Sequence, residues 1–181
     1  MADAGSGIGG SRDLFVFNLG FIRDRRLKRI LALAGWDVRL GWPTATQHLA
    51  AWGQSPTAHR AERVAKRTGA ALIRIEDAFL RSVHPGRSGD PPLGLLIDRR
   101  GAHFDPAQPS DLEVLLATDP LDDTAMLDRA RDLMAQMQRD EVAKYSAYDP
   151  ALPVPEPGYV LVVDQTRGDA AVTASGANRA T

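Results

Sequence analysis

Acidic side chains follow three apolar, strand-like runs of this 181-residue chain. They are Glu76, Asp77, Asp98, Asp164 and Asp169. Open α/β sheets bind ligands outside the carboxyl ends of their strands, so we expect these carboxylates to share one crevice. Paired carboxylates suit glycosyl chemistry, because one can trap an oxocarbenium-like centre while another handles protons. Any one of them taken singly is better explained as an N-cap, a turn former or an ion-pair partner of an arginine, whereas for the group both interpretations stay open.

The last of these runs, Tyr159–Val163, is rich in the aromatic and β-branched residues that favour strands. Asp164 and Gln165 follow it at once, and Gly168 stands just before Asp169. A buried strand that leads into a polar, glycine-bearing loop predicts a ligand site. The alternative is an Asp-Gln turn followed by a solvated loop, and the spacing leaves both open.

Composition and missing motifs exclude several functions. Cysteine is absent, which excludes disulfides and thiol catalysis, and the four histidines form no metal-ligand pattern, so no metal is expected. No dinucleotide fingerprint follows a strand, and neither a P-loop nor a GxSxG elbow occurs, so no cofactor is expected. The net charge of −1 indicates neither nucleic acid nor an anionic membrane as a partner. No secretory signal or bilayer-spanning run is visible, which favours a cytoplasmic protein.

Apolar periodicity predicts alternating strands and helices, and hence an α/β fold with a mostly parallel sheet covered by helices. The expected strands are 14–17, 37–42, 71–75, 93–97 and 159–163. The expected helices are 22–34, 56–68, 110–116 and 126–145, the last with a methionine stripe predicted to face the core. We expect a flexible tail over 1–12, one domain over 13–149, and a linker, last strand and start of a further region over 150–181.

Three ordered motifs resemble those of bacterial capsule polysaccharide biosynthesis and export proteins. Trp52-Gly53 followed by Arg74–Val83 is similar to a segment with a Glu-Asp-Gly-Phe-Leu-Arg-Ser signature. Leu95–Asp98 with Phe104–Glu113 resembles the strand and the Asp-x-x-x-Pro-Ser-Asp-Leu-Glu segment that follow in that family. Val162–Ala170 is similar to its Val-Asp-Gln-x-x-Gly-Asp-Ala motif. Together the motifs span the chain from Trp52 to Ala170.

The resemblance implies a retaining β-Kdo transferase that moves Kdo from CMP-Kdo onto a lipid-linked glycan acceptor at the cytoplasmic face of the inner membrane. The implied fold is the Rossmann-like N-terminal half of a GT-B glycosyltransferase, with helices on both faces of a parallel sheet. Peripheral contact with capsule assembly proteins is implied, and nucleic acid is not. The implied catalytic residues are Asp169 as nucleophile, Asp164 as the alternative nucleophile and Glu76 as acid/base. The implied substrate-binding residues are Gln165, Asp77, Arg81, Ser82 and Arg167.

Departures from the family pattern qualify this expectation. Ala78 replaces a common glycine, and Ala171 replaces a usual serine. The donor-binding half with its His-Pro element is not found before Thr181, so we expect a fragment with little or no transferase activity. The alternative from another class is a non-catalytic domain that binds a glycan or an assembly partner. An unrelated flavodoxin-like or receiver-like domain would make the motifs coincidences.

Overall fold

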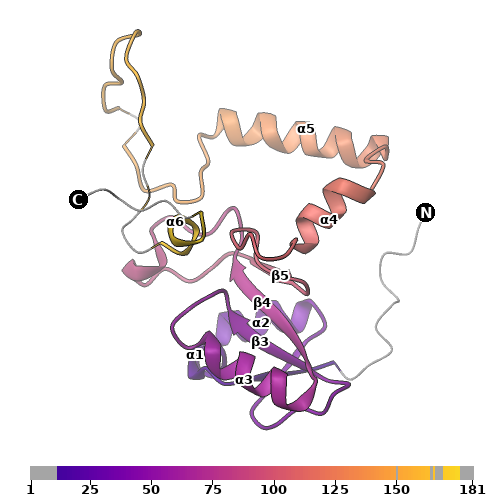
Figure 1. The fold of residues 1–181 in the computed structure, drawn as a ribbon. Helices are drawn as coiled ribbons and strands as arrows, with labels where there is room; N and C mark the ends of the chain where they lie inside the picture. Colours follow the sequence, from indigo (N-terminus) through magenta and orange to yellow (C-terminus); the bar gives the residue numbers. More distant parts are fainter. Residues whose placement is uncertain (1–11, 150, 164, 166–168, 176–181) are drawn as a thin grey trace.

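The fold is built on a five-stranded sheet in the order β2-β1-β3-β4-β5 (Figure 1). The computed structural model describes residues 12–149, 151–163, 165 and 169–175. Four strands are parallel, and β5 pairs antiparallel with β4. The strands are β1 (Asp13–Val16), β2 (Asp37–Arg39), β3 (His48–Trp52), β4 (Ala71–Asp77) and β5 (Leu95–Asp98).

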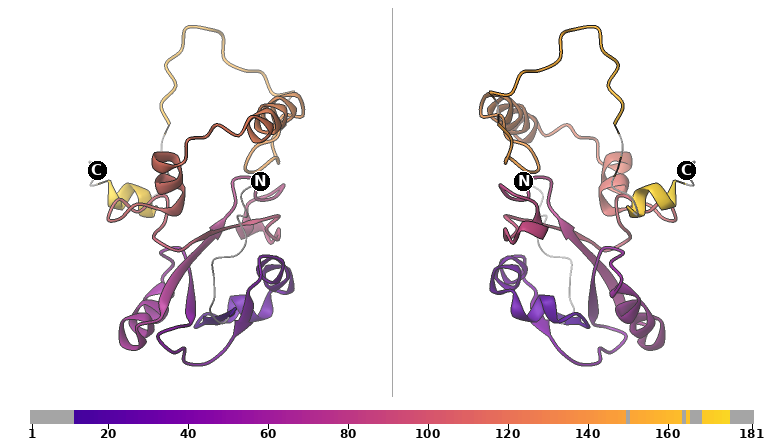
Figure 2. Two further views of the ribbon diagram at one scale, coloured as in Figure 1. Left: turned by 90° about the vertical axis from the view of Figure 1, so that its right-hand side faces the viewer. Right: turned by 90° about the vertical axis from the view of Figure 1, so that its left-hand side faces the viewer.

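Helices cover both faces of this sheet, because its strands alternate their apolar side chains between the two sides. Helices α1 (Leu19–Arg23) and α2 (Arg25–Leu33) lie on one face, and α3 (Ala58–Thr68) lies on the other (Figure 2). The α2 side buries Phe21, Leu27 and Leu31 against Leu14, Val16, Ile73 and Ile75. The α3 side buries Val64 and Leu49, with Phe15, Phe17 and Leu72 packed around them. The expected α/β fold with two helical layers is confirmed.

The central strand β3 was not predicted from the sequence. Its residues include His48 and two alanines, types that carry little strand preference. The alanines are nevertheless buried, and Ala51 packs against Ala58 and Ala61 of α3. Small side chains at this contact let the helix approach the sheet closely, so packing rather than propensity explains the strand.

Two helices beyond the sheet bury none of their side chains. They are α4 (Asp111–Thr118) and α5 (Thr124–Arg139). The capping box predicted at Ser110 and Glu113 is confirmed at the start of α4. The methionine stripe of α5 was predicted to be core, and this is wrong, because Met126 is 67% exposed. The physical reason is that α5 lies away from the sheet, at the other end of the molecule from α3 (Figure 1).

The strand expected over Tyr159–Val163 is also not formed. This segment is extended but unpaired, and Val160 is 88% exposed. It follows a proline-rich stretch in an arch that rises away from the sheet (Figure 2). A strand is stable only when a neighbour accepts its hydrogen bonds, and no strand among the described residues lies beside it. High strand preference alone was therefore insufficient.

The remaining elements are the short helices η1 (Gly86–Ser88) and α6 (Ala170–Ala174). In the part of the chain that the structure describes, every helix is too short or too polar to cross a bilayer.

Candidate active site

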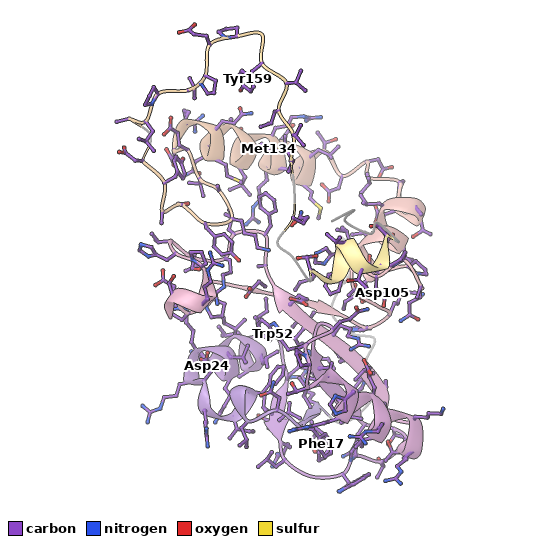
Figure 3. All side chains as sticks on the ribbon, turned by 60° about the vertical axis from the view of Figure 1, so that its left-hand side comes forward. Phe17, Asp24, Trp52, Asp105, Met134 and Tyr159 are labelled. Atoms are coloured by element: carbon purple, nitrogen blue, oxygen red, sulfur yellow. The ribbon has the colours of Figure 1, made fainter. Side chains whose placement is uncertain are left out.

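A cavity of about 570 Å³ opens at the carboxyl ends of β3 and β4. Its lining comes from five segments of the chain, namely Trp52, Gln54 and Ser55, then Glu76 and Asp77, then His103 and Phe104, then Lys144, and finally Gln165, Asp169 and Ala171. In Figure 3, Trp52 lies at the end of the sheet that faces α6, and Asp105 lies beside that helix. Gln54 Nε2 donates a 2.7 Å hydrogen bond to Asp105 Oδ2 and so ties the end of β3 to the loop that carries His103 and Phe104.

Glu76 lines this cavity with its carboxylate packed against the backbone of the neighbouring strand end. Gly53 has φ +38°, its N–H donates to the Ile75 carbonyl at 2.9 Å, and its own carbonyl accepts from Arg74 Nη1 at 2.7 Å. The Glu76 carboxylate lies directly over the Gly53 Cα. A Cβ on Gly53 would be 2.7 Å from Glu76 Cδ and closer still to Oε1. Only a glycine at position 53 leaves room for the Glu76 carboxylate in its present position.

Burial raises the pKa of Glu76. A hydrogen bond from the Asp77 backbone opposes the shift, the Asp77 carboxylate adds to it, and the positive charges of Lys144 and Arg74 oppose it. A carboxyl group whose pKa is raised towards neutral pH can exchange protons with a substrate more readily than an ordinary one. Glu76 therefore has the environment of an acid/base group.

Asp77 connects the cavity to a buried arginine. Arg81 is only 8% exposed, and its Nε lies 3.2 Å from Asp77 Oδ1, close enough for an ion pair but not aligned for a hydrogen bond. The same guanidinium donates to Ser82 Oγ at 2.7 Å and to the Asp90 carbonyl. Ser82 Oγ in turn donates to the His84 carbonyl at 2.6 Å. Arg81 and Ser82 thus hold the loop between β4 and β5 and do not line the cavity.

Gln165 and Asp169 of the last motif reach the same cavity. Asp169 is the N-cap of α6, and its Oδ1 accepts the Ala171 N–H at 2.8 Å. Gln165 lines the cavity from the segment before it. Asp169 therefore caps α6 and also lines the cavity, so both interpretations of this carboxylate agree with the structure. Asp164 and Arg167 lie outside the described residues.

Asp98 does not join the crevice expected for the strand-end carboxylates. It is 2% exposed, and it accepts backbone N–H groups of Arg100 and Gly101 at 2.8 Å each and of Asp111 at 2.9 Å. Since β5 runs antiparallel to β4, its end pairs with Arg74, in the middle of β4, instead of meeting Asp77. The hydrogen bonds give Asp98 a structural role in joining β5 to α4.

Several lining residues were missed by reasoning from the sequence. Gln54 and Ser55 follow a strand that was not predicted, and His103 and Phe104 come from a loop without periodicity. Lys144 was expected in a helix that runs to residue 145, but α5 ends at Arg139 and leaves it in a loop. A polar cluster directly after Trp52-Gly53 was the only available signal. Within the described ranges, no three acidic or histidine side chains are grouped closely enough to hold a metal ion.

Fold and site together define a Rossmann-like α/β protein with a carboxylate-lined cavity at its strand ends. The chain belongs to the family described as capsule polysaccharide biosynthesis protein, whose sequence model matches residues 47–181. The resemblance expected from the three motifs is thereby confirmed.

The chain is similar to part of two longer relatives. It is 35% identical over 137 residues to the capsule polysaccharide modification protein LipA of Neisseria meningitidis serogroup A, covering 72% of this chain and 19% of LipA. It is 34% identical over 135 residues to the lipopolysaccharide-processing protein LpsZ of Rhizobium meliloti, covering 72% of this chain and 30% of LpsZ. The chain thus spans a fifth to a third of these relatives.

Two solved structures share the fold. The Thermosulfurimonas dismutans KpsC, beta Kdo 2,4 transferase, superposes with a TM-score of 0.76 at 26% identity, over 92% of this chain and 53% of that one. The beta Kdo 2,7 transferase of the same organism gives a TM-score of 0.59 at 22% identity, over 89% of this chain and 51% of that one. The second likeness concerns the fold alone.

Proposed function

We propose that this chain carries the acceptor-side half of a retaining β-Kdo transferase that acts in capsule polysaccharide biosynthesis. The observation that carries the proposal is the cavity that gathers Glu76, Asp77, Gln165 and Asp169. It is supported by the family membership and by the likeness to a solved beta Kdo 2,4 transferase. The donor is CMP-Kdo, the acceptor a lipid-linked glycan, and the place of action the cytoplasmic face of the inner membrane.

In the proposed reaction the Asp169 carboxylate attacks the anomeric carbon of Kdo. The bond from that carbon to the phosphate oxygen of CMP breaks, CMP leaves with the electron pair, and a covalent Kdo–Asp169 ester forms. An acceptor hydroxyl then attacks the same carbon from the face that CMP has left. Its proton passes to Glu76, and the Asp169 carboxylate is released. Two inversions retain the configuration at the anomeric carbon.

The other cavity residues have supporting roles in this proposal. Gln165 positions the sugar, and Asp77 binds the acceptor while its ion pair with Arg81 fixes its orientation. Lys144 brings a positive charge to the cavity, where the carboxylate of Kdo needs one. Asp164 stays the alternative nucleophile, and substrate binding by Arg81, Ser82 and Arg167 stays a prediction.

The test separates transfer from simple binding. The chain, alone and fused to the remainder of a longer family member, is incubated with CMP-Kdo and a Kdo-bearing glycolipid, and CMP release and intact protein mass are measured. A mass increase of one Kdo residue that disappears in Asp169→Asn supports the proposal. Glycolipid binding without CMP release in either form refutes it and favours the alternative, a non-catalytic glycan-binding domain.

A further inference from the structure

The two parts of the chain carry opposite charge. Residues 12–75 contain twelve Lys or Arg and four Asp or Glu, a net charge of +8. Residues 76–181 contain ten and eighteen, a net charge of −8. The near-zero net charge of the whole chain therefore hides a strong separation. In Figure 1 the basic part, with α1 to α3, lies at one end of the molecule, and α5 of the acidic part lies at the other.

The basic charge is densest on the α2 surface, which we define as Arg23, Arg25, Arg26, Lys28, Arg29 and Leu33. All six side chains are exposed. Residues 23–33 contain one acidic residue, Asp24. It is the N-cap of α2, and its carboxylate accepts the N–H groups of Arg26 at 2.8 Å and Leu27 at 2.9 Å. Within the described part of the chain, none of the five cations forms an ion pair.

The α2 surface also presents apolar groups to solvent. Leu33 is 73% exposed and follows Arg25 and Arg29 at spacings of eight and four residues, so the three lie on one stripe of the helix. Leu19, at the start of α1, is exposed as well. Beside α2, a groove of about 320 Å³ is lined by Lys28 and Arg39, together with Ala32, Trp36, Asp37 and Val38. Cations next to exposed leucines are typical of helices that lie in a membrane interface.

Helix α3 provides an internal comparison on the opposite face of the sheet (Figure 2). It carries four exposed cations, Arg60, Arg63, Lys66 and Arg67. Its acidic residue Glu62 is bound to Arg74 at 2.6 Å. It has no large exposed apolar side chain over Ala58–Thr68. The α3 surface thus has four exposed cations against five on the α2 surface, but it lacks the apolar component that an interfacial contact needs.

We propose that the α2 surface docks this protein on an anionic phospholipid bilayer. Its cations lie against the lipid headgroups, and Leu33 and Leu19 enter the interface. Residues 76–181 as a whole carry a net charge of −8 and are repelled by the same surface, although α5 itself has three Arg and two Asp. In Figure 3, Asp24 at the start of α2 and Met134 on α5 lie well apart. Docking does not rest on the proposed transferase function.

The experiment is vesicle co-sedimentation of the full chain. Vesicles of phosphatidylcholine, with and without phosphatidylglycerol, are compared at low salt and at about 0.15 M salt. The variants are R25Q/R26Q/K28Q/R29Q, the matched R60Q/R63Q/K66Q/R67Q on α3, and Leu33→Ser, with circular dichroism confirming the fold of each. We expect binding only to phosphatidylglycerol vesicles, weakened by salt. The α2 variant should lose at least about 100-fold in partition, and the α3 variant much less.

Leu33→Ser should weaken binding while keeping its salt dependence. Equal losses in the α2 and α3 variants would overturn the proposal, because the attraction would then follow net charge rather than a surface. Absence of wild-type binding to phosphatidylglycerol vesicles, or equal binding to neutral vesicles, would overturn it too. Duplex DNA that binds more tightly than these vesicles would identify a nucleic-acid surface instead. None of these outcomes depends on Kdo transfer.

Discussion

The carboxylate of Glu76 occupies the space that a side chain on Gly53 would need. The two residues lie at the ends of neighbouring parallel strands, β3 and β4, and Gly53 is anchored there by its hydrogen bond to the Ile75 carbonyl. The contact joins Trp52-Gly53 to Glu76-Asp77 across the ends of the two strands. The glycine shapes the site for the carboxylate.

Gly53→Ala should therefore displace Glu76 and cost about 1–3 kcal/mol of unfolding free energy, from strained backbone and overpacking. Urea unfolding measures the loss, and the ¹³C chemical shift of the Glu76 carboxyl group reports its displacement. In the Glu76→Ala background the added methyl group has room, so the cost of Gly53→Ala should shrink. Gly89→Ala is the control, since Gly89 has φ +94° but no atom near its Cβ position. If both glycine variants cost the same in both backgrounds, the contact with Glu76 is irrelevant.

Glu76 should make stability depend on pH in a defined direction. Because burial raises its pKa in the folded state, the folded protein holds this proton more tightly than the unfolded chain. The resulting stability is fully present below the ordinary pKa of glutamate and is lost as pH rises through the raised value. Glu76→Gln should remove this loss. The free energy of unfolding of the variant should therefore rise relative to that of the wild type as pH increases across that window. Urea unfolding at successive pH values tests it, and parallel curves would contradict the shift.

Asp169 should have a chemical role separable from its role as N-cap. Asparagine caps helices as well as aspartate does but is a poor nucleophile. In a fusion that is active in Kdo transfer, both Asp169→Asn and Asp169→Ala should lose at least about 1,000-fold in turnover. Amide exchange in α6 should increase only in the alanine variant. Full activity of the asparagine variant would make Asp169 a cap only and would turn attention to Asp164.

Arg81 should be a structural residue of the loop between β4 and β5. Replacing it with alanine leaves the Asp77 carboxylate and the Asp90 carbonyl without their partner, which should cost about 2–4 kcal/mol of unfolding free energy. Arg87→Ala, an exposed arginine in the same loop, should change stability by less than about 0.5 kcal/mol. Thermal unfolding of both variants measures the difference. Equal, small effects would show that the buried network is dispensable.

Much of the fold could be predicted from local patterns. Strands β1, β4 and β5 and helices α2, α3 and α4 follow from apolar periodicity and from caps such as Ser110 with Glu113, because those signals lie within one turn or one strand. The family followed from the three motifs. The grouping of Glu76 and Asp77 with Asp169 was expected from carboxylates at strand ends, and the cavity brings them together although the strand expected before Asp164 does not form.

The tertiary structure decided the features that depend on distant partners. Strand β3 forms because β1 and β4 lie on either side of it, whereas Tyr159–Val163, with stronger strand preference, has no neighbour in the described structure. The antiparallel pairing of β5 removes Asp98 from the cavity, and the ion pair with Asp77 draws Arg81 into the interior. Periodicity and capping are properties of a few adjacent residues. Pairing, burial and the space beside Gly53 exist only once segments far apart in the chain have met.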